Sequence, residues 1–98
     1  MKAESRWSVR LLPVALRQFR RLDLGVQLEA AELFGELTED AFPFGVEPME
    51  GYANLYKLRF YGDRYRIVYK VFEQSRRVFV TGIGPRGSVY SGLRRPSR

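Results

Sequence analysis

The sequence contains neither cysteine nor histidine. Without cysteine the chain can form no disulfide and perform no thiol chemistry, and we expect a cytoplasmic protein. Without histidine it lacks the commonest general base at neutral pH, the commonest metal ligand and every nucleophile arrangement that depends on imidazole. Any catalysis must therefore use other side chains.

Long uninterrupted apolar runs are also absent. The apolar segments are short and broken by charged residues, so none is predicted to span a bilayer. The first seven residues include Glu4 and no apolar stretch, which is not the pattern of a secretory signal. A length of 98 residues predicts one domain over residues 1–98, with a disordered basic tail at about 93–98.

Acidic residues are scarce in the C-terminal half. Residues 1–56 hold 6 Lys and Arg against 9 Asp and Glu, whereas residues 57–98 hold 11 against 2. The net charge of +6 therefore belongs to the C-terminal half. This polarity indicates a polyanionic partner, which charge alone leaves open among RNA, DNA and an acidic protein segment.

The apolar pattern predicts the order β-α-α-β-β-β. A first strand at 7–12 precedes a helix that begins at Pro13, and a second helix follows at about 26–37. A loop over 38–52 leads to two strands within 55–72 and a last strand at 78–83. We therefore expect an α+β domain in which a helical hairpin packs on one face of a small, mainly antiparallel four-stranded sheet.

The segment from Leu55 to Phe72 is predicted to be a β-hairpin. Its two strands flank Gly62-Asp63, a pair suited to a tight two-residue turn, and this turn places Arg59 opposite Arg66. Side chains alternate across a strand, so the two faces differ in chemistry. One face is apolar, with Tyr56, Leu58, Phe60, Tyr65, Ile67 and Tyr69; the other is basic, with Lys57, Arg59, Arg64, Arg66 and Lys70.

The basic face is predicted to lie open and to bind an anion. Like charges on opposite strands are destabilising, so the pairing of Arg59 with Arg66 gains nothing for folding by itself. We expect no carboxylate within this face, because the acids lie mostly on the second helix and the following loop. Arg86 and Tyr90 follow the last strand on a loop that can lean over the same face.

Four phrases together resemble the RelE branch of the RelE/ParE superfamily of bacterial type II toxins. They are EGYANLYKLRF, YGDRYRIVYKV, VFVTGIG and GPRGSVY, and the resemblance runs from about Trp7 to Tyr90. It implies a small toxin that enters the ribosomal A site, cleaves the mRNA there and is held inactive by a cognate antitoxin with an acidic or amphipathic segment. It also implies that no metal or cofactor takes part.

The resemblance assigns site residues one at a time. The basic positions of the family match Lys57, Arg59, Arg66 and Arg86, and its terminal tyrosine matches Tyr90. Arginine stands at position 59 where many members have lysine, and arginine stays protonated, so it cannot act as a base. The implied set is Lys57, Arg66, Arg86 and Tyr90 for catalysis, with Arg59, Arg64 and Lys70 for RNA binding.

Cleavage of RNA by its own 2′-hydroxyl requires a base, stabilisation of the phosphate charge and a proton for the leaving 5′-oxygen. We predict that Tyr90 is the base, because neighbouring cations lower the pKa of a phenol. Lys57 and Arg66 would hold the scissile phosphate, and Arg86 would stabilise charge or donate the proton. Two alternatives remain: a ParE-like inhibitor of DNA gyrase without nuclease activity, and a nucleic-acid-binding module without chemistry.

Overall fold

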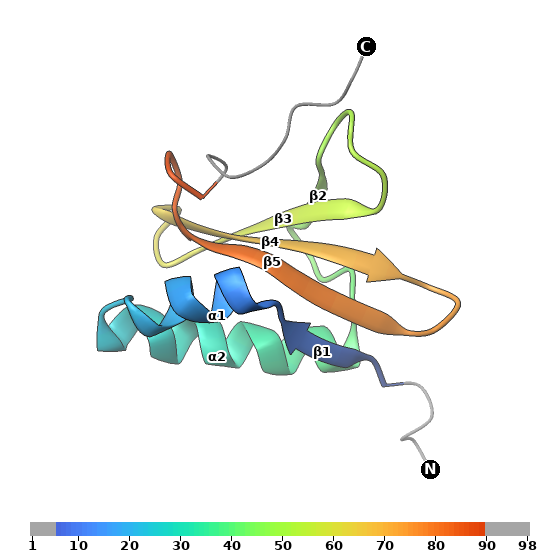
Figure 1. Ribbon diagram of the computed structural model, residues 1–98, viewed down its shortest axis with the longest axis horizontal. Helices are drawn as coiled ribbons and strands as arrows, with labels where there is room; N and C mark the ends of the chain where they lie inside the picture. Colours follow the sequence, from blue (N-terminus) through green and yellow to red (C-terminus); the bar gives the residue numbers. More distant parts are fainter. Residues whose placement is uncertain (1–5, 90–98) are drawn as a thin grey trace.

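The computed structural model describes residues 6–89, which form two helices and five strands (Figure 1). Tyr90 and the predicted disordered tail at 93–98 lie outside the described residues. Within residues 6–89, no helix has the length and apolar character needed to cross a membrane. The elements are β1 Ser8–Leu11, α1 Pro13–Arg20, α2 Leu24–Glu39, β2 Glu47–Pro48, β3 Leu55–Phe60, β4 Tyr65–Phe72 and β5 Arg77–Pro85.

The strands form one sheet in the order β1-β5-β4-β3-β2. β1 runs parallel to β5 and all other neighbours are antiparallel, which confirms the predicted mainly antiparallel α+β class. The sheet has five strands rather than four, because β2 adds a two-residue edge strand within the predicted loop. Glu47 precedes Pro48, and a residue before proline favours extended backbone, so this short segment can pair with β3.

Both helices cover one face of the sheet, as the two layers in Figure 1 show. The core between the layers joins buried residues of α2, such as Val26 and Leu37, to buried residues of β4 and β5, such as Tyr69 and Val80. Trp7, Val9 and Leu11 pack against this core. Neither helix of residues 6–89 covers the opposite face of the sheet, which is therefore a candidate place for a site.

The hairpin has the predicted register. Arg59 pairs with Arg66 and Phe60 with Tyr65, and every other pair from Tyr56 onward is as expected. Residues 61–64 connect the strands, and Tyr61, Gly62 and Asp63 all have positive φ, of 54°, 64° and 70°, a conformation that costs least at glycine. The turn therefore fixes which side chains reach each face.

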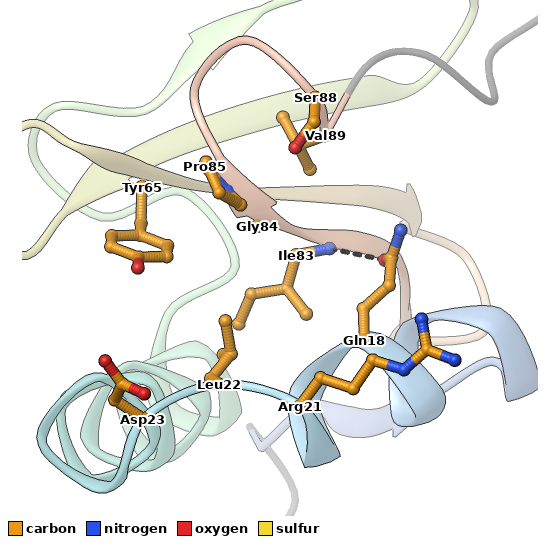
Figure 2. Close-up of a pocket in the computed structure, with 10 residues that line it drawn as sticks. All are labelled: Gln18, Arg21, Leu22, Asp23, Tyr65, Ile83, Gly84, Pro85, Ser88 and Val89. Atoms are coloured by element: carbon orange, nitrogen blue, oxygen red, sulfur yellow. Dashed lines mark hydrogen bonds between the residues drawn. The ribbon is translucent and has the colours of Figure 1, made fainter.

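Because β1 pairs with residues 77–80, no strand within residues 6–89 lies beside the far end of β5 on this side. Gln18 of α1 covers part of this edge: its Oε1 accepts a hydrogen bond of 2.9 Å from the backbone N–H of Ile83. Figure 2 shows this contact in a pocket between the end of α1 and the end of β5. The helix layer thereby holds the strand end that leads directly into Arg86.

Candidate nucleic-acid interface

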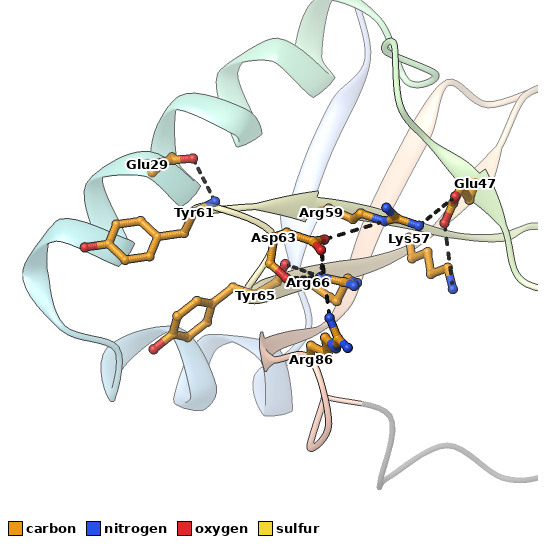
Figure 3. A network of polar contacts seen from close by, with 9 residues as sticks. All are labelled: Glu29, Glu47, Lys57, Arg59, Tyr61, Asp63, Tyr65, Arg66 and Arg86. Atoms are coloured by element: carbon orange, nitrogen blue, oxygen red, sulfur yellow. Dashed lines mark hydrogen bonds and ion pairs between the residues drawn. The ribbon is translucent and has the colours of Figure 1, made fainter.

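Four predicted site residues meet on the face of the sheet that has no helix (Figure 3). Lys57 and Arg59 extend from β3, Arg66 from β4 and Arg86 from the turn that follows β5. They come from three separate segments, and the strand register brings them to one place. The grouping of these four cations agrees with the sequence prediction.

A carboxylate lies among these cations, contrary to the prediction that this face would contain none. Oδ1 of Asp63 lies 3.3 Å from Nη1 of Arg66 and 3.8 Å from Nε of Arg59. Its Oδ2 lies 3.8 Å from Nη1 of Arg86. In the sequence Asp63 was assigned only to the turn. Its position three residues before Arg66 was the signal that the two side chains could meet. The turn conformation places its side chain beside three guanidinium groups.

Arg66 is held more firmly than the other site cations. Its side chain is only 8% exposed, and Nη1 donates hydrogen bonds to the backbone oxygens of Asp63, at 2.9 Å, and Tyr65, at 3.2 Å. Among residues 6–89, the hydrogen bonds of the Arg66 guanidinium come from Nη1. A buried guanidinium fixed in this way is preorganised for binding.

A second carboxylate, that of Glu47, lies at the edge of the group. Its Oε2 accepts a hydrogen bond of 3.1 Å from Nη2 of Arg59, and its Oε1 lies 3.8 Å from Nζ of Lys57. Glu47 belongs to β2, and its pairing with Lys57 across the sheet places it there. A short extended segment before a proline was the signal in the sequence, and the prediction of a loop missed it.

Four cations and two carboxylates leave this group with two excess positive charges. Asp63 lies close to both Arg59 and Arg66, which stand opposite each other on β3 and β4, and so offsets their repulsion. These contacts are largely exposed apart from Arg66, so solvent screens them and each contributes little to stability. Their main effect is to keep the cations close together.

The turn after β5 folds back over the sheet. The N–H groups of Ser88 and Val89 donate to the oxygen of Pro85, and the N–H of Arg86 donates to the oxygen of Arg64. Val89 packs on Val68 and Leu55, so part of the basic face is covered by a small apolar cluster and is less open than predicted. Val89 also lies close to Gly82 of β5, since a Cβ at Gly82 would be 3.5 Å from Cγ2 of Val89.

The other predicted residues lie apart from this group. Arg64 is in the hairpin turn and borders a hollow with Glu29 and Tyr61, so it does not continue the face of Arg66. Lys70 lies on the same face as Arg66 but farther along β4, paired with Leu55 and Phe79. Tyr90 lies outside the described residues, directly after Val89.

Similarity to known proteins is found among solved structures. No protein-family model and no curated protein matches the sequence. Solved structures do match: the isolated E. coli RelE toxin is 26% identical, with a TM-score of 0.71 over 87% of this chain and 92% of the toxin. An archaeal RelE–RelB complex from Pyrococcus horikoshii is 22% identical, with a TM-score of 0.73 over 85% of this chain and 98% of its match.

A third match is the toxin–antitoxin complex RelBE2 from Mycobacterium tuberculosis, at 19% identity and a TM-score of 0.70 over 85% of this chain and 94% of its match. The two matches below 25% identity support the fold alone. The agreement covers nearly the whole described chain and supports the resemblance drawn from the sequence: the chain has the α+β fold of the RelE toxins.

Proposed function

We propose that this chain is the toxin of a type II toxin–antitoxin system and acts as a ribosome-dependent endoribonuclease. It cleaves mRNA in the ribosomal A site by attack of the 2′-hydroxyl on the adjacent phosphate and so arrests translation. One observation carries this proposal: Arg59, Arg66 and Arg86 already approach a single anion, the carboxylate of Asp63. A phosphate beside that carboxylate would be within reach of the same guanidinium groups.

Arg66 and Lys57 are assigned to the scissile phosphate. Arg66 is buried and fixed by two backbone oxygens, so its guanidinium would bind a phosphate without first losing conformational freedom. Lys57 lies at the edge of the same group, beside Glu47. Both side chains would stabilise the extra negative charge that develops on the phosphate during attack.

Arg86 is assigned to the leaving 5′-oxygen. Its side chain is 63% exposed, so it can move toward a substrate, while its backbone N–H anchors the turn to Arg64. Tyr90 is assigned as the general base that takes the proton of the 2′-hydroxyl. Arg59 and Lys70 would bind the RNA backbone. Arg64 would bind the RNA farther from the scissile phosphate, at the hairpin turn.

We also propose an antitoxin partner and a cytoplasmic location, where ribosomes and mRNA are found. Similar structures include RelE proteins in complex with RelB, and one with a RelB peptide. The excess positive charge of the site favours an antitoxin segment that is acidic or amphipathic, which would compete with RNA for the same cations.

Primer extension on a defined mRNA in a reconstituted translation reaction tests the nuclease function. The parent, Arg86→Ala and Tyr90→Phe are compared with and without ribosomes, and Arg20→Ala on the helix face is the matched control. We expect cuts at A-site codons only with ribosomes, for the parent and the control, and at least about 100-fold slower cutting by both site variants.

Intact mRNA in every lane would exclude the nuclease. A gyrase supercoiling assay then tests the ParE-like alternative, in which inhibition by the parent is expected without any cleavage of RNA. If Tyr90→Phe cuts as fast as the parent, Tyr90 is not the base.

A further inference from the structure

A second group of cations lies on the same face of the sheet, at the opposite end of β4 and β5. Arg10 of β1 pairs with Phe79 of β5, and Phe79 pairs with Lys70 of β4. Arg77 and Phe72 form the next pair along the same two strands. Side chains that are paired across strands share a face, so these residues lie on the side of the sheet opposite the helices. Together we call Arg10, Lys70, Phe72, Arg77 and Phe79 the distal patch.

The three cations of the distal patch have no acidic partner within residues 6–89. No ion pair of 4.0 Å or less joins Arg10, Lys70 or Arg77 to a carboxylate in this part of the chain. The candidate site is different, because Asp63 and Glu47 offset part of its charge. The distal patch is therefore the more strongly unbalanced end of this face.

The distal patch also presents aromatic surface. The rings of Phe72 and Phe79 meet edge to face, with centroids 5.7 Å apart, and Phe72 is 39% exposed. Neither ring belongs to the core between the sheet and the helices. A hollow of about 190 Å³ lies between Phe79, Arg10, Arg77 and Ser8. It is smaller than the roughly 300–1,000 Å³ of typical small-molecule pockets, but its two guanidinium groups suit a single phosphate.

We propose that the distal patch is a second contact site for single-stranded RNA, in which Arg10, Lys70 and Arg77 bind phosphates and the exposed face of Phe72 stacks on a base. This inference rests on the proposed function, since it extends the path of the RNA beyond the scissile phosphate. Cationic grooves combined with aromatic side chains are the recurrent means of binding single strands without sequence preference. An acidic protein segment would use the cations but gain little from an exposed aromatic face.

The spacing of the two sites fits one continuous strand of RNA. Lys70 follows Arg66 by four residues on β4, which at about 3.3 Å per residue is roughly 13 Å, and Phe72 lies roughly 20 Å away. A few nucleotides cover such a distance. The small apolar cluster of Val68 and Val89 lies between the two groups, so the strand of RNA would cross it.

Binding of fluorescent RNA, measured by anisotropy over a range of salt concentrations, tests this site. A 3-mer and a 12-mer are compared for the parent, for Arg10→Gln/Arg77→Gln, and for the control Arg17→Gln/Arg20→Gln on α1, which removes the same charge from the helix face. We expect the distal variant to bind the 12-mer several-fold more weakly. The logarithm of its binding constant should fall less steeply with the logarithm of the salt concentration. Loss of two phosphate contacts should reduce the magnitude of that slope by about 1.4, at about 0.7 per contact on a single strand. The 3-mer can occupy either site alone, so its affinity should fall less than that of the 12-mer.

Phe72→Leu tests the stacking contact separately, because leucine keeps apolar contact with Phe79 but has no aromatic face. We expect at least about fivefold weaker binding of the 12-mer and no change for an abasic 12-mer. Thermal unfolding of each variant checks that it is folded, and both substituted arginines are exposed in the parent.

Equal affinity and equal salt slope for parent and distal variant would overturn the inference. It would also be overturned if Phe72→Leu bound RNA as the parent does while polyglutamate displaced the RNA efficiently, since that result assigns the patch to an acidic protein. Failure of the proposed function gives a different result: mRNA stays intact with ribosomes, yet RNA binding still depends on the distal patch.

Discussion

Oδ1 of Asp63 lies 3.3 Å from Nη1 of Arg66, so the most deeply buried cation of the candidate site already has an anionic partner within its own chain. The same carboxylate lies 3.8 Å from both Arg59 and Arg86. It therefore stands where three guanidinium groups converge, beside the position that we propose for the phosphate. The carboxylate keeps these cations together in the free protein and repels a phosphate that approaches them.

Asp63→Asn is expected to strengthen RNA binding. The amide keeps an oxygen near Arg66 but removes the negative charge that a phosphate would meet, and asparagine tolerates the positive φ of this position. We expect several-fold tighter binding of single-stranded RNA at low salt, with a smaller gain at high salt. Glu32→Gln, which removes an equal charge from an exposed position on α2, is the matched control and should have little effect. Weaker binding by Asp63→Asn would mean that the charge itself is required to position Arg66.

Arg66→Lys is expected to reduce both stability and cleavage. Lysine has no planar fork, so it cannot donate to the oxygens of Asp63 and Tyr65 while also offering two N–H groups to a phosphate. Loss of buried hydrogen bonds costs about 1–3 kcal/mol, and loss of a preorganised donor slows cleavage by about 100-fold or more.

Urea unfolding and primer extension measure the two effects of Arg66→Lys. Arg17→Lys on α1 makes the same chemical change at an exposed position and should leave both unchanged. Normal cleavage by a folded Arg66→Lys protein would show that Arg66 does not need to donate two N–H groups to the phosphate.

The sequence was sufficient to predict the hairpin and the residues that its register brings together. Gly62-Asp63 determines the register, and the register brings Arg59, Arg66 and the start of the final turn together. The acids were missed for two different reasons. The turn alone explains an aspartate at position 63, so the pattern gave no separate indication of its contacts with the arginines. Glu47 reaches Lys57 because β2 forms at the sheet edge.

The distal patch could not be predicted from the pattern along the chain either. It depends on Arg10 lying beside Phe79, which follows from the parallel pairing of β1 with β5. Alternation within each strand indicates which residues share a face of that strand, but it does not indicate which distant strand lies alongside. The sequence therefore predicted the local site better than the contacts between its first and last strands.

Alkaline pH is expected to destabilise the protein through Tyr69. Burial, reinforced by the negative charge of Asp40 and by Tyr56, raises the pKa of the Tyr69 phenol well above its ordinary value, and its O–H donates to the oxygen of Ala41 at 2.9 Å. The folded state therefore keeps a proton that the unfolded state loses above about pH 10. Ionisation of this group therefore leaves stability independent of pH below about pH 10, and stability falls as the pH rises further, by up to about 1.4 kcal/mol per pH unit.

Urea unfolding between pH 9 and pH 11 measures this dependence for the parent and for Tyr69→Phe. The variant should be less stable at pH 9, since the oxygen of Ala41 loses its donor, but its stability should fall less steeply above pH 10. Equal slopes for the two proteins would show that Tyr69 is not the source of the alkaline sensitivity.

Gln18→Leu is expected to loosen the end of β5. The N–H of Ile83, a residue that is 1% exposed, would lose its acceptor, at a cost of about 1–3 kcal/mol. Hydrogen exchange at the amide of Ile83 should become faster, whereas exchange at Val71 in the middle of the sheet should change only as much as global stability does. Gln18→Glu retains an acceptor oxygen and should lose less protection.

The same variant connects the fold to the proposed site. β5 ends at Pro85 and leads directly into Arg86, so a loose strand end would broaden the positions that Arg86 can take relative to Asp63. We therefore expect Gln18→Leu to slow mRNA cleavage in primer extension even at temperatures where the protein is fully folded. Slower cleavage with unchanged exchange at Ile83 would contradict this explanation, because the effect on Arg86 would then not pass through the strand.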